Sequence, residues 1–448
     1  MRTRESVCRV VWSRVSQAAV LACVAASATI AAGQSNERAA FVVNDGNNEG
    51  SVTSYLIDED GSVEFVQKLV TGEGPGFDYG TNATAVSITP NGKFLAIGHA
   101  SGDPPPGDPP GRRVTIVQVH HDATMSMYMD FLTDPTPNSV QWIDDEYLVV
   151  TKSNFSQGSE LIMYHVDVDD EVVTEIDRKA TGVFMDSIAL HPTGDYLFAE
   201  TTWGDYTLQA FRINADRTLT LKDSVDSSSF VLGLSVTPDG SRVYGGGGIS
   251  ADAVTGFDFD PETGGLSELS NSPYPSPGDG PRQAVISPDG STLVAGHGGD
   301  ATIHTYLIDE PTGDLTLTGY TFDAGFQANL RDMQVHEDLL LVPARGVTSS
   351  DPQGLATFAF LPDGSLEMKG DFVDSQGINP DGVVGWSPLM CPADLTGDGV
   401  VGGADLGTLL ASWGTCPDPD ECPEDLTGDG AVGGADLGML LANWGPCP

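Results

Sequence analysis

Short apolar segments recur in pairs along residues 36–388, and a tight polar turn joins the two segments of each pair. Each segment has the length of a β-strand and the clearest turns carry Pro-x-Gly, so each pair predicts a β-hairpin. The clearest copies are AVSITPNGKFLAIGH (85–99), SIALHPTGDYLFAET (187–201), GLSVTPDGSRVYGGG (233–247) and AVISPDGSTLVAGHG (284–298). Weaker copies without the proline are SVQWIDDEYLVVTK (139–152) and DMQVHEDLLLVPAR (332–345). The turns lie about 50 residues apart and are marked by Pro90, Ile143, Pro192, Pro238, Pro288 and His336.

A second alternating segment with an acidic turn follows these hairpins. Examples are VTSYLIDEDGSVEFV (52–66), TLQAFRINADRTLTL (207–221), VTGFDFDPETGGLSEL (254–269), IHTYLIDEPTGDLTL (303–317) and LATFAFLPDGSLEM (355–368). Each repeat therefore contains four antiparallel strands, which is one blade of a β-propeller. We predict an all-β propeller over residues 34–390.

The two ends of this region predict how the ring closes. AAFVVND (39–45) matches only the second strand of a hairpin, and GVVGWSPLM (382–390) matches only the first strand and its turn. We therefore expect the ends to share a seventh blade, with the C-terminal strand innermost, which leaves no open sheet edge. The competing architecture is a parallel β-solenoid, whose repeats are shorter and would not contain two different hairpins.

The net charge of the chain limits the classes of molecule that it can bind. Asp and Glu outnumber Lys and Arg by 64 to 20, for a formal charge of −44. Binding to a nucleic-acid backbone needs clustered Lys and Arg, so the composition excludes a nucleic-acid partner. The high counts of 54 Gly and 29 Pro favour many turns and few long helices.

Residues 1–33 have the pattern of an export signal peptide. A positive region precedes a stretch of small apolar residues, and Ala31 and Gly33 supply the small residues of a cleavage site. The positive region consists of Arg2, Arg4, Arg9 and Arg14. The alternative is a membrane anchor, for which this apolar stretch is short. We expect a mature monomer with no membrane span that is secreted, periplasmic or held at the cell surface.

Residues 391–448 contain a duplicated acidic loop of a different kind. CPADLTGDGVVGGADLGTLLASWGTC (391–416) and CPEDLTGDGAVGGADLGMLLANWGPC (422–447) share D-x-T-x-D-G-x-x-G-x-x-D, a twelve-residue calcium loop of EF-hand type. Alternate residues of such a loop turn their oxygens inward, so we predict two calcium ions. The ligands of the first would be Asp394, Thr396, Asp398, the Val400 carbonyl and Asp405; those of the second would be Asp425, Thr427, Asp429, the Ala431 carbonyl and Asp436. Thr at position 3 and Asp at position 12 predict binding in the weak, extracellular range.

Four cysteines confined to this short exported module predict disulfides. Each repeat has one Cys before its loop and one after its helix, so we predict the pairs Cys391–Cys416 and Cys422–Cys447. The other two schemes, 391–422 with 416–447 and 391–447 with 416–422, would cross between repeats.

Leucines and a tryptophan at helical spacing follow each loop, at 406–413 and 437–444. A duplicated calcium loop followed by one helix, with Asp at position 12, resembles a type I dockerin. The resemblance implies attachment to a cohesin-like or other cell-surface protein. In that family positions 10 and 11 of the loop help to select the partner; here they are Gly403-Ala404 and Gly434-Ala435 instead of the usual hydroxyl pairs.

The propeller region, with GPRQAVISPDGSTLVAG at 280–296, resembles the lactonase-type seven-bladed propellers, the 6-phosphogluconolactonase-like family. The segment Gly280-Pro281-Arg282 carries the more specific part of this resemblance. The family usually has His after that arginine, where this chain has Gln283. The resemblance implies hydrolysis of a lactone or sugar-derived ester.

The topology of a propeller predicts where a site would lie. The innermost strand of each blade begins, and the neighbouring strand ends, at the same mouth of the central channel. The predicted strand starts are Thr81, Asn82, Asn138, Asp186, Arg282, Arg331 and Asp381; the predicted ends are Asp45, His99, Lys152, Glu200, His297 and Arg345. We predict that Arg282 and Arg331 bind a substrate oxygen and that Asp186 or Glu200 activates water as a general base. The predicted substrate-binding residues are Asn82, His99, Asn138, His297, Arg345 and Asp381. The alternative is a network of ion pairs that only closes the channel.

The sequence is compatible with two functions. The first is an exported lactone hydrolase. The second is a non-catalytic propeller that binds a small molecule or glycan and is held at the cell surface by its calcium tail. Residues 34–390 contain no H-E-x-x-H, G-x-S-x-G or Walker motif that would favour another enzyme class.

Overall fold

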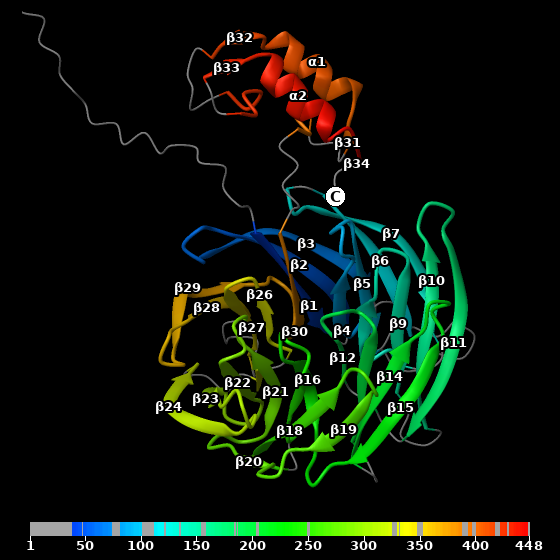
Figure 1. Ribbon diagram of the computed structural model, residues 1–448, viewed down its shortest axis with the longest axis vertical. Helices are drawn as coiled ribbons and strands as arrows, with labels where there is room; N and C mark the ends of the chain where they lie inside the picture. Colours follow the sequence, from blue (N-terminus) through cyan, green and yellow to red (C-terminus); the bar gives the residue numbers. More distant parts are fainter. Residues whose placement is uncertain are drawn as a thin grey trace, which may run out of the picture.

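The computed structural model describes most of the chain between residues 38 and 446 (Figure 1). The described residues are 38–46, 48–73, 81–100, 112–120, 122–133, 136–153, 158–182, 185, 187–202, 206–248, 251–324, 329–330, 332–346, 353–387, 393–396, 400–416, 422–427 and 430–446. The predicted signal peptide, 1–33, lies outside them. No helix within these ranges is long and apolar enough to cross a membrane.

Within the described ranges, the strands of the main body form seven antiparallel sheets arranged as the blades of a propeller (Figure 1). We number the blades in chain order and give their strands from the centre outwards. Blade 1 contains β30 (Pro380–Trp386), β1 (Arg38–Asp45), β2 (Glu49–Ile57) and β3 (Val63–Glu73). Blade 2 contains β4 (Ala83–Ile88), β5 (Phe94–His99), β6 (Arg113–Val119) and β7 (Met125–Leu132). Blade 3 contains β8 (Val140–Trp142), β9 (Tyr147–Lys152), β10 (Ser159–Asp167) and β11 (Val172–Gly182).

The remaining blades follow the same plan. Blade 4 contains β12 (Ile188–Leu190), β13 (Tyr196–Thr201), β14 (Thr207–Ile213) and β15 (Leu219–Asp226). Blade 5 contains β16 (Leu232–Val236), β17 (Arg242–Gly246), β18 (Ala253–Asp260) and β19 (Gly265–Glu268), with β20 (Tyr274–Pro275) also paired to β18. Blade 6 contains β21 (Pro281–Ile286), β22 (Thr292–His297), β23 (Thr302–Ile308) and β24 (Leu315–Asp323). In blade 7 the inner position is divided between β25 (Asn329–Leu330) and β26 (Gln334–His336), followed by β27 (Leu339–Arg345), β28 (Gly354–Phe360) and β29 (Leu366–Asp374).

The ring closes through blade 1, as the sequence predicts. Strand β1 lies between β2 and β30 and pairs with both in antiparallel register, with Phe41 opposite Val384 and Val42 opposite Val383. The C-terminal strand of the propeller is therefore innermost, and the N-terminal strand is its neighbour. This arrangement confirms the predicted shared blade.

The Pro-x-Gly sequences form the turns between the two inner strands of their blades. Gly92, Gly194, Gly240 and Gly290 have φ angles of 72°, 74°, 75° and 75°. A side chain is disfavoured at such positive φ, which explains why each turn places glycine at the same step. The repeat visible in the sequence is thus a repeat of backbone geometry.

The hydrophobic core lies mostly between neighbouring blades. One cluster joins blades 2 and 3 and includes Ile116 and Trp142, which are almost fully buried. Another joins blades 6 and 7, where the rings of Phe322 and Phe358 pack edge to face with centroids 4.9 Å apart. Outer strands such as β15 are more exposed: half-buried and exposed residues alternate from Asp223 to Asp226. Each blade is therefore held mainly by its two neighbours.

The C-terminal tail folds around two short helices, α1 (Gly403–Ala411) and α2 (Gly434–Ala442). Its two-residue strands pair between the repeats: β31 (Val400–Val401) with β34 (Gly445–Pro446), and β32 (Gly414–Thr415) with β33 (Ala431–Val432). Leu409 and Leu440, at equivalent positions of the two helices, are completely buried in its core. The two repeats thus form one module.

The predicted disulfide scheme within each repeat is wrong. Cys416 is bonded to Cys422, so the partner of Cys416 is not Cys391 and that of Cys422 is not Cys447. The reason is the pairing of β32 with β33, which brings the residues after α1 beside the second loop, where the Cys416 N–H donates to the Gly430 carbonyl at 3.0 Å. Cys391 and Cys447 lie outside the described residues.

We predict that buried His99 makes the propeller sensitive to mild acid. Burial, assisted by the charge of Arg113, lowers the pKa of His99 to about 3, whereas in the unfolded chain a histidine titrates near pH 6.5. Between these two pKa values His99 is protonated in the unfolded state but neutral in the folded state. Its contribution to the free energy of unfolding is therefore fully present above about pH 6.5 and is lost as the pH falls toward 3.

The measurement is chemical denaturation at several pH values between about 7 and 4.5, above the range in which most carboxylates titrate. The variant His99→Gln should lose less unfolding free energy across this range than the wild type. His120→Gln, at an exposed histidine, should behave like the wild type. Equal slopes for His99→Gln and the wild type would contradict the assignment.

Candidate functional site

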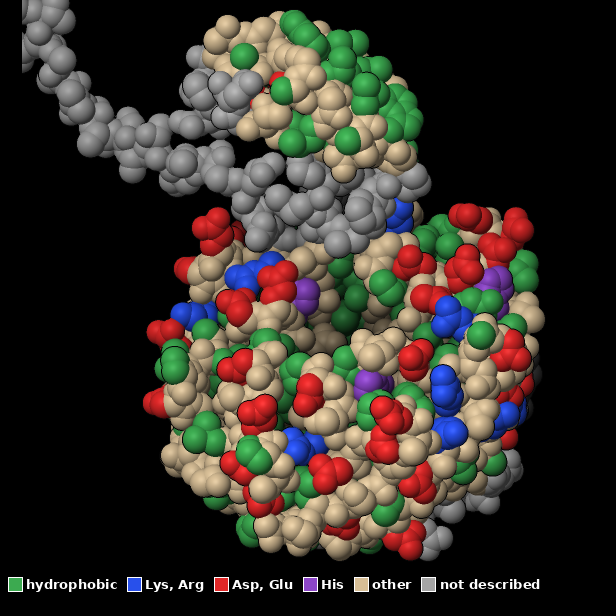
Figure 2. All heavy atoms as spheres, viewed as in Figure 1, with side chains coloured by type: hydrophobic (Ala, Val, Ile, Leu, Met, Phe, Trp, Pro, Cys, Tyr) green, Lys and Arg blue, Asp and Glu red, His purple; other side chains and the backbone are tan. Residues whose placement is uncertain are grey.

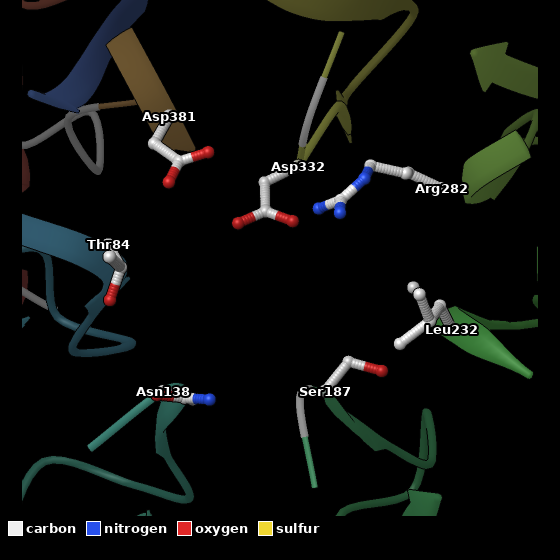
Figure 3. A pocket seen from close by; sticks show the side chains of 8 residues that line it. Thr84, Asn138, Ser187, Leu232, Arg282, Asp332 and Asp381 are labelled. Atoms are coloured by element: carbon white, nitrogen blue, oxygen red, sulfur yellow. The ribbon is translucent and has the colours of Figure 1, made fainter. Parts of the chain in front are cut away.

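A polar cavity of about 190 Å³ lies at the channel end where the innermost strands begin. Every blade contributes to its lining, and Figure 3 shows the side chains converging from around the ring. The lining residues are Asp381, Thr84, Asn138, Ser187, Leu232 with Gly233, Arg282 and Asp332, in blade order. The space-filling view shows a hollow in the middle of the ring (Figure 2).

Irregularities at the start of the inner strands aim these side chains into the cavity. In β4 the pairing shifts between Ala83 and Ala85, so Thr84 is the extra residue of a β-bulge. In β21 the shift falls between Pro281 and Gln283, which makes Arg282 the equivalent residue. Comparable shifts occur next to Gly233 in β16 and Asp381 in β30. The site is therefore built from a repeated backbone feature.

In blade 7 the same irregularity divides the inner strand in two. Leu330 pairs with Ala344 and Gln334 pairs with Leu341, so three residues of the inner strand face only two of β27. Asp332 is in the middle of these three, with a positive φ of 39°. Its carboxylate thereby reaches the cavity.

Arg282 and the two aspartates determine the electrostatics of the cavity. The guanidinium of Arg282 and the carboxylate of Asp332 point toward one another (Figure 3). Asp381 projects from the neighbouring blade and is 2% exposed. Among the described lining residues, Arg282 is the single cation beside two carboxylates. The cavity therefore offers one guanidinium group and two carboxylates to a bound molecule.

The position of Arg282 depends on a glycine in the preceding blade. Gly233 has a positive φ of 54°, and a Cβ there would lie 2.3 Å from the Arg282 carbonyl oxygen and 2.7 Å from Cα of Gln283. The backbone of β21 therefore rests directly on β16. A side chain at this point would displace the bulge that carries Arg282.

Glu200 lies beneath the cavity and supports Ser187. Its Oε1 accepts hydrogen bonds from the backbone N–H of Ser187 at 2.7 Å and from its hydroxyl at 3.3 Å. Glu200 is completely buried and does not line the cavity. Its carboxylate therefore holds Ser187 at the start of the inner strand, and the general-base role stays a prediction from the sequence.

The two histidines predicted for the site are held inside their blades. His99 Nε2 is 3.0 Å from the Thr115 hydroxyl, and His297 is hydrogen-bonded to Ser276 at 2.7 Å and to the Thr302 carbonyl at 3.1 Å. Both are completely buried. Burial lowers the pKa of His297 as it does that of His99, so both favour the neutral form.

Other predicted residues form contacts around the mouth without lining the cavity. Arg345 pairs with Asp45 at 3.1 Å, and Lys152 pairs with Glu160 at 3.1 Å. Asn82 is 7% exposed and has a positive φ of 51°. These ion pairs involve predicted mouth residues, but they do not line the cavity.

Of the ten predicted propeller site residues, the structure brings Arg282, Asn138 and Asp381 together in the cavity. Asp186 and Arg331 lie outside the described residues. The residues after them, Ser187 and Asp332, line the cavity and were not predicted.

Comparisons with known proteins agree with this fold. A family model described as lactonase, 7-bladed beta-propeller, matches residues 231–328. No curated protein sequence matches the chain. Among solved structures, the periplasmic gluconolactonase of Pseudomonas aeruginosa is similar with a TM-score of 0.62 and 19% identity, covering 78% of this chain and 99% of its own. A protein of Bacteroides fragilis proposed to be a 6-phosphogluconolactonase gives 0.60 and 18%, covering 79% and 98%. At this identity the likeness establishes the fold: the chain contains a lactonase-like seven-bladed propeller.

We predict that Gly233→Ala destabilises the propeller more than an alanine placed at another positive-φ glycine. Positive φ alone costs a residue with a side chain about 1–3 kcal/mol. At Gly233 the clash with the Arg282 carbonyl adds to that cost, by about 1 kcal/mol or more.

Gly319→Ala is the matched control, because Gly319 has a φ of 85° but a Cβ at this position would have nothing within 4 Å. Chemical denaturation of both variants measures the difference in unfolding free energy. Equal losses for the two variants would show that β21 does not rest on Gly233 as described.

Proposed function

We propose that the protein is an exported hydrolase of lactones and that the cavity at the channel mouth is its active site. The observation that supports this proposal most directly is Arg282, aimed into a cavity to which all seven blades contribute, beside the carboxylate of Asp332. A propeller of the same fold is the periplasmic gluconolactonase of Pseudomonas aeruginosa.

The proposed reaction uses Arg282 to hold the lactone carbonyl. Negative charge develops on that oxygen when water attacks the carbonyl carbon, and a fixed guanidinium stabilises it. Asp332 accepts a proton from the attacking water as it bonds to carbon. The bond between the carbonyl carbon and the ring oxygen then breaks, and the ring oxygen takes up the proton held by Asp332 and becomes the alcohol group of the opened chain. The product is the hydroxy acid.

The polar neutral residues complete the proposed site. Thr84, Asn138 and Ser187 line the cavity on the side opposite Arg282 and Asp332 (Figure 3). Their hydroxyl and amide groups both donate and accept hydrogen bonds. They would orient a substrate that carries hydroxyl groups, and Glu200 fixes Ser187 in place.

We predict that Arg282→Ala lowers the rate of lactone hydrolysis by two to three orders of magnitude while leaving the thermal midpoint of the propeller nearly unchanged. Arg282 projects into the cavity, so its removal leaves the packing between blades intact. Losing a stabilising group for the developing charge reduces kcat by about 10²–10³.

The measurement is the initial rate with a panel of lactones, corrected for spontaneous hydrolysis, together with thermal unfolding. Arg212→Ala, at an exposed arginine of β14, is the matched control and should keep wild-type rates. A wild-type protein that binds sugars but hydrolyses no lactone would favour the non-catalytic, ligand-binding alternative.

We further propose that the C-terminal tail binds two calcium ions. The described ligand candidates converge in both repeats: the Thr396 hydroxyl is 2.8 Å from Asp405 Oδ1 and 3.5 Å from Asp394 Oδ1. The Thr427 hydroxyl is 2.8 Å from Asp436 Oδ1 and 3.4 Å from Asp425 Oδ1. Oxygens of positions 1, 3 and 12 thus lie together, as a hard cation requires. Asp398 and Asp429, the position-5 ligands, lie outside the described residues.

The carboxylates at position 12 are suited to this role. Asp405 and Asp436 are completely buried, and burial alone would raise the pKa of each. Hydrogen bonds outweigh it: Gly402 N–H donates to Asp405 and Gly433 N–H to Asp436, and with those from Thr396 and Thr427 they hold both pKa values below the usual range. Both carboxylates therefore stay ionised.

The tail also supports a role in attachment. Apolar side chains gather over its helices (Figure 2), and equivalent residues of the two repeats are exposed to the same degree: Leu410 50%, Leu441 51%, Trp413 50% and Trp444 50%. Such a surface is typical of an interaction site. We propose that this dockerin-like tail holds the exported protein to a cohesin-like or other cell-surface protein.

We predict that the full chain binds two calcium ions, with dissociation constants of about 10⁻⁴–10⁻³ M. Titration calorimetry measures the stoichiometry. The double variant Asp394→Ala/Asp425→Ala removes position 1 from both loops and should bind none. Asp363→Ala, in an exposed turn of blade 7, is the control and should bind two. Full binding by the double variant would refute the ligand assignment.

A further inference from the structure

A separate pocket of about 620 Å³ lies at the end of blade 4 opposite the channel mouth. Strand β12 starts at the mouth and runs to the inner turn at 192–195, and β14 runs the same way to the outer turn at 214–217. The pocket forms where these two turns meet, and it shares no described lining residue with the proposed active site. Its charged or amide-bearing lining residues are Asp195, Arg212, Asn214 and Arg217.

The two arginines of this pocket are held against aromatic rings. The guanidinium of Arg212 lies over the ring of Tyr196, 5.9 Å from its centroid. That of Arg217 lies 5.0 Å from the ring centroid of Tyr147 in blade 3 and also pairs with Asp144 at 2.5 Å. A guanidinium that rests on an aromatic face keeps its N–H donors for other partners. The arginines are therefore positioned with donors left for a ligand.

The arginines distinguish this turn from the corresponding turns of other blades. In blades 1, 5 and 6 the turn between the two outer strands contains no Lys or Arg and is acidic, with Asp58, Glu59 and Asp60, with Asp260 and Glu262, and with Asp309 and Glu310. In blade 4 the acidic residue of the turn, Asp216, accepts hydrogen bonds from Thr218 and does not line the pocket. Arg212 is exposed and forms no ion pair with the part of the chain that the structure describes. Blade 4 therefore offers guanidinium donors to an anion at an end of the ring that is otherwise rich in carboxylates.

Asp195 restricts which anion fits. Its carbonyl accepts a hydrogen bond from the Ile213 N–H at 2.8 Å, which fixes the inner turn to β14, and its side chain lines the same pocket as the arginines. An ionised carboxylate only accepts hydrogen bonds, so it repels an anion that offers no donor. A phosphate group, with about −1.5 to −2 charges at neutral pH, would be repelled most. A ligand that combines one carboxylate with hydroxyl groups satisfies both the arginines and Asp195.

We propose that this pocket binds the carboxylated sugar units, the hexuronates, of an acidic polysaccharide. The planar guanidinium groups of Arg212 and Arg217 match the carboxylate, and Asp195 accepts from the sugar hydroxyls. The volume of about 620 Å³ is within the range of small-molecule sites. Because the pocket and the mouth lie at opposite ends of blade 4, a polysaccharide bound here leaves the mouth open.

The test measures binding of small glycosides to the full chain by ligand-observed NMR titration. The probes are the methyl glycosides of D-galacturonate and D-glucuronate, which imitate a chain-linked unit, and those of D-galactose and D-glucose, which lack the carboxylate. Acetate and inorganic phosphate supply charge without the sugar. At least one uronide should bind about tenfold more tightly than its neutral counterpart, acetate or phosphate.

Three variants locate the binding. Arg212→Gln should weaken uronide binding about tenfold, because it removes a charged donor. Lys222→Gln is the matched control: it removes the same charge from an exposed position of β15 in the same blade, outside the pocket, and should keep wild-type affinity. Asp195→Ala should weaken uronide binding but not acetate binding. Thermal unfolding of each variant shows that a lost affinity comes from a folded protein.

The contrary results are equally specific. If neither uronide binds, or if Arg212→Gln and Lys222→Gln have the same affinity for it, the pocket is not the site and the proposal is refuted. If acetate or phosphate binds as tightly as the uronides, the pocket is a simple anion site and the sugar assignment is wrong. None of these results affects the proposed hydrolase, whose cavity lies at the other end of the blade.

Discussion

Close approach of neighbouring blades at the channel mouth is the constraint on which the rest of the propeller depends. In blades 2, 5 and 6 the second strand carries a glycine where it meets the next blade: a Cβ on Gly98 would lie 2.8 Å from the Pro137 carbonyl oxygen, and one on Gly246 would lie 2.3 Å from that of Pro281. At Gly296 it would lie 2.7 Å from the side chain of Met333. Each contact is made by a residue next to a cavity residue, namely Asn138, Arg282 and Asp332. The packing that closes the ring therefore also positions the site.

The same contact explains why the inner strands begin irregularly. An inner strand that rests on the backbone of the preceding blade needs an extra residue to keep its pairing within its own blade. The β-bulge supplies that residue and turns one side chain toward the axis. Blade 7 shows this most clearly, because Pro343 of β27 has no N–H to donate to the inner strand opposite. Backbone geometry thus directs a side chain into the cavity, and the blades differ in which side chain this is.

The sequence predicted the fold well because the repeat is a local signal. Strand alternation, Pro-x-Gly turns and the two half-hairpins at the ends are each visible within about 15 residues, and together they gave the blades and the shared closing blade. The site was predicted less well. Hairpin alignment places residues only approximately along an inner strand, so it did not single out Ser187 and Asp332, which line the cavity; the predictions for Arg331 and Asp186 lie outside the described residues.

Two further features depend on contacts that the repeat pattern does not specify. Glu200 was predicted to be a base because it ends its strand at the mouth; it is completely buried and accepts a hydrogen bond from the Ser187 N–H at the start of the same hairpin, and its role as a base stays a prediction. The disulfide scheme assumed that each tail repeat closes on itself. Strand pairing across the repeats joins Cys416 to Cys422 instead. The similarity of the two repeat sequences predicted similar local structures, but it did not show that their strands pair with one another.

The charge distribution gives the proposed reaction a direction. A lactone without ionised groups can enter the mouth of a chain with a formal charge of −44 at little electrostatic cost. Hydrolysis then creates a carboxylate inside a cavity that already contains Asp332 and Asp381. The guanidinium of Arg282 faces both the new carboxylate and Asp332, so its attraction is shared between them. In the proposed reaction, repulsion from the two aspartates and from the surface would therefore favour release of the product over its return.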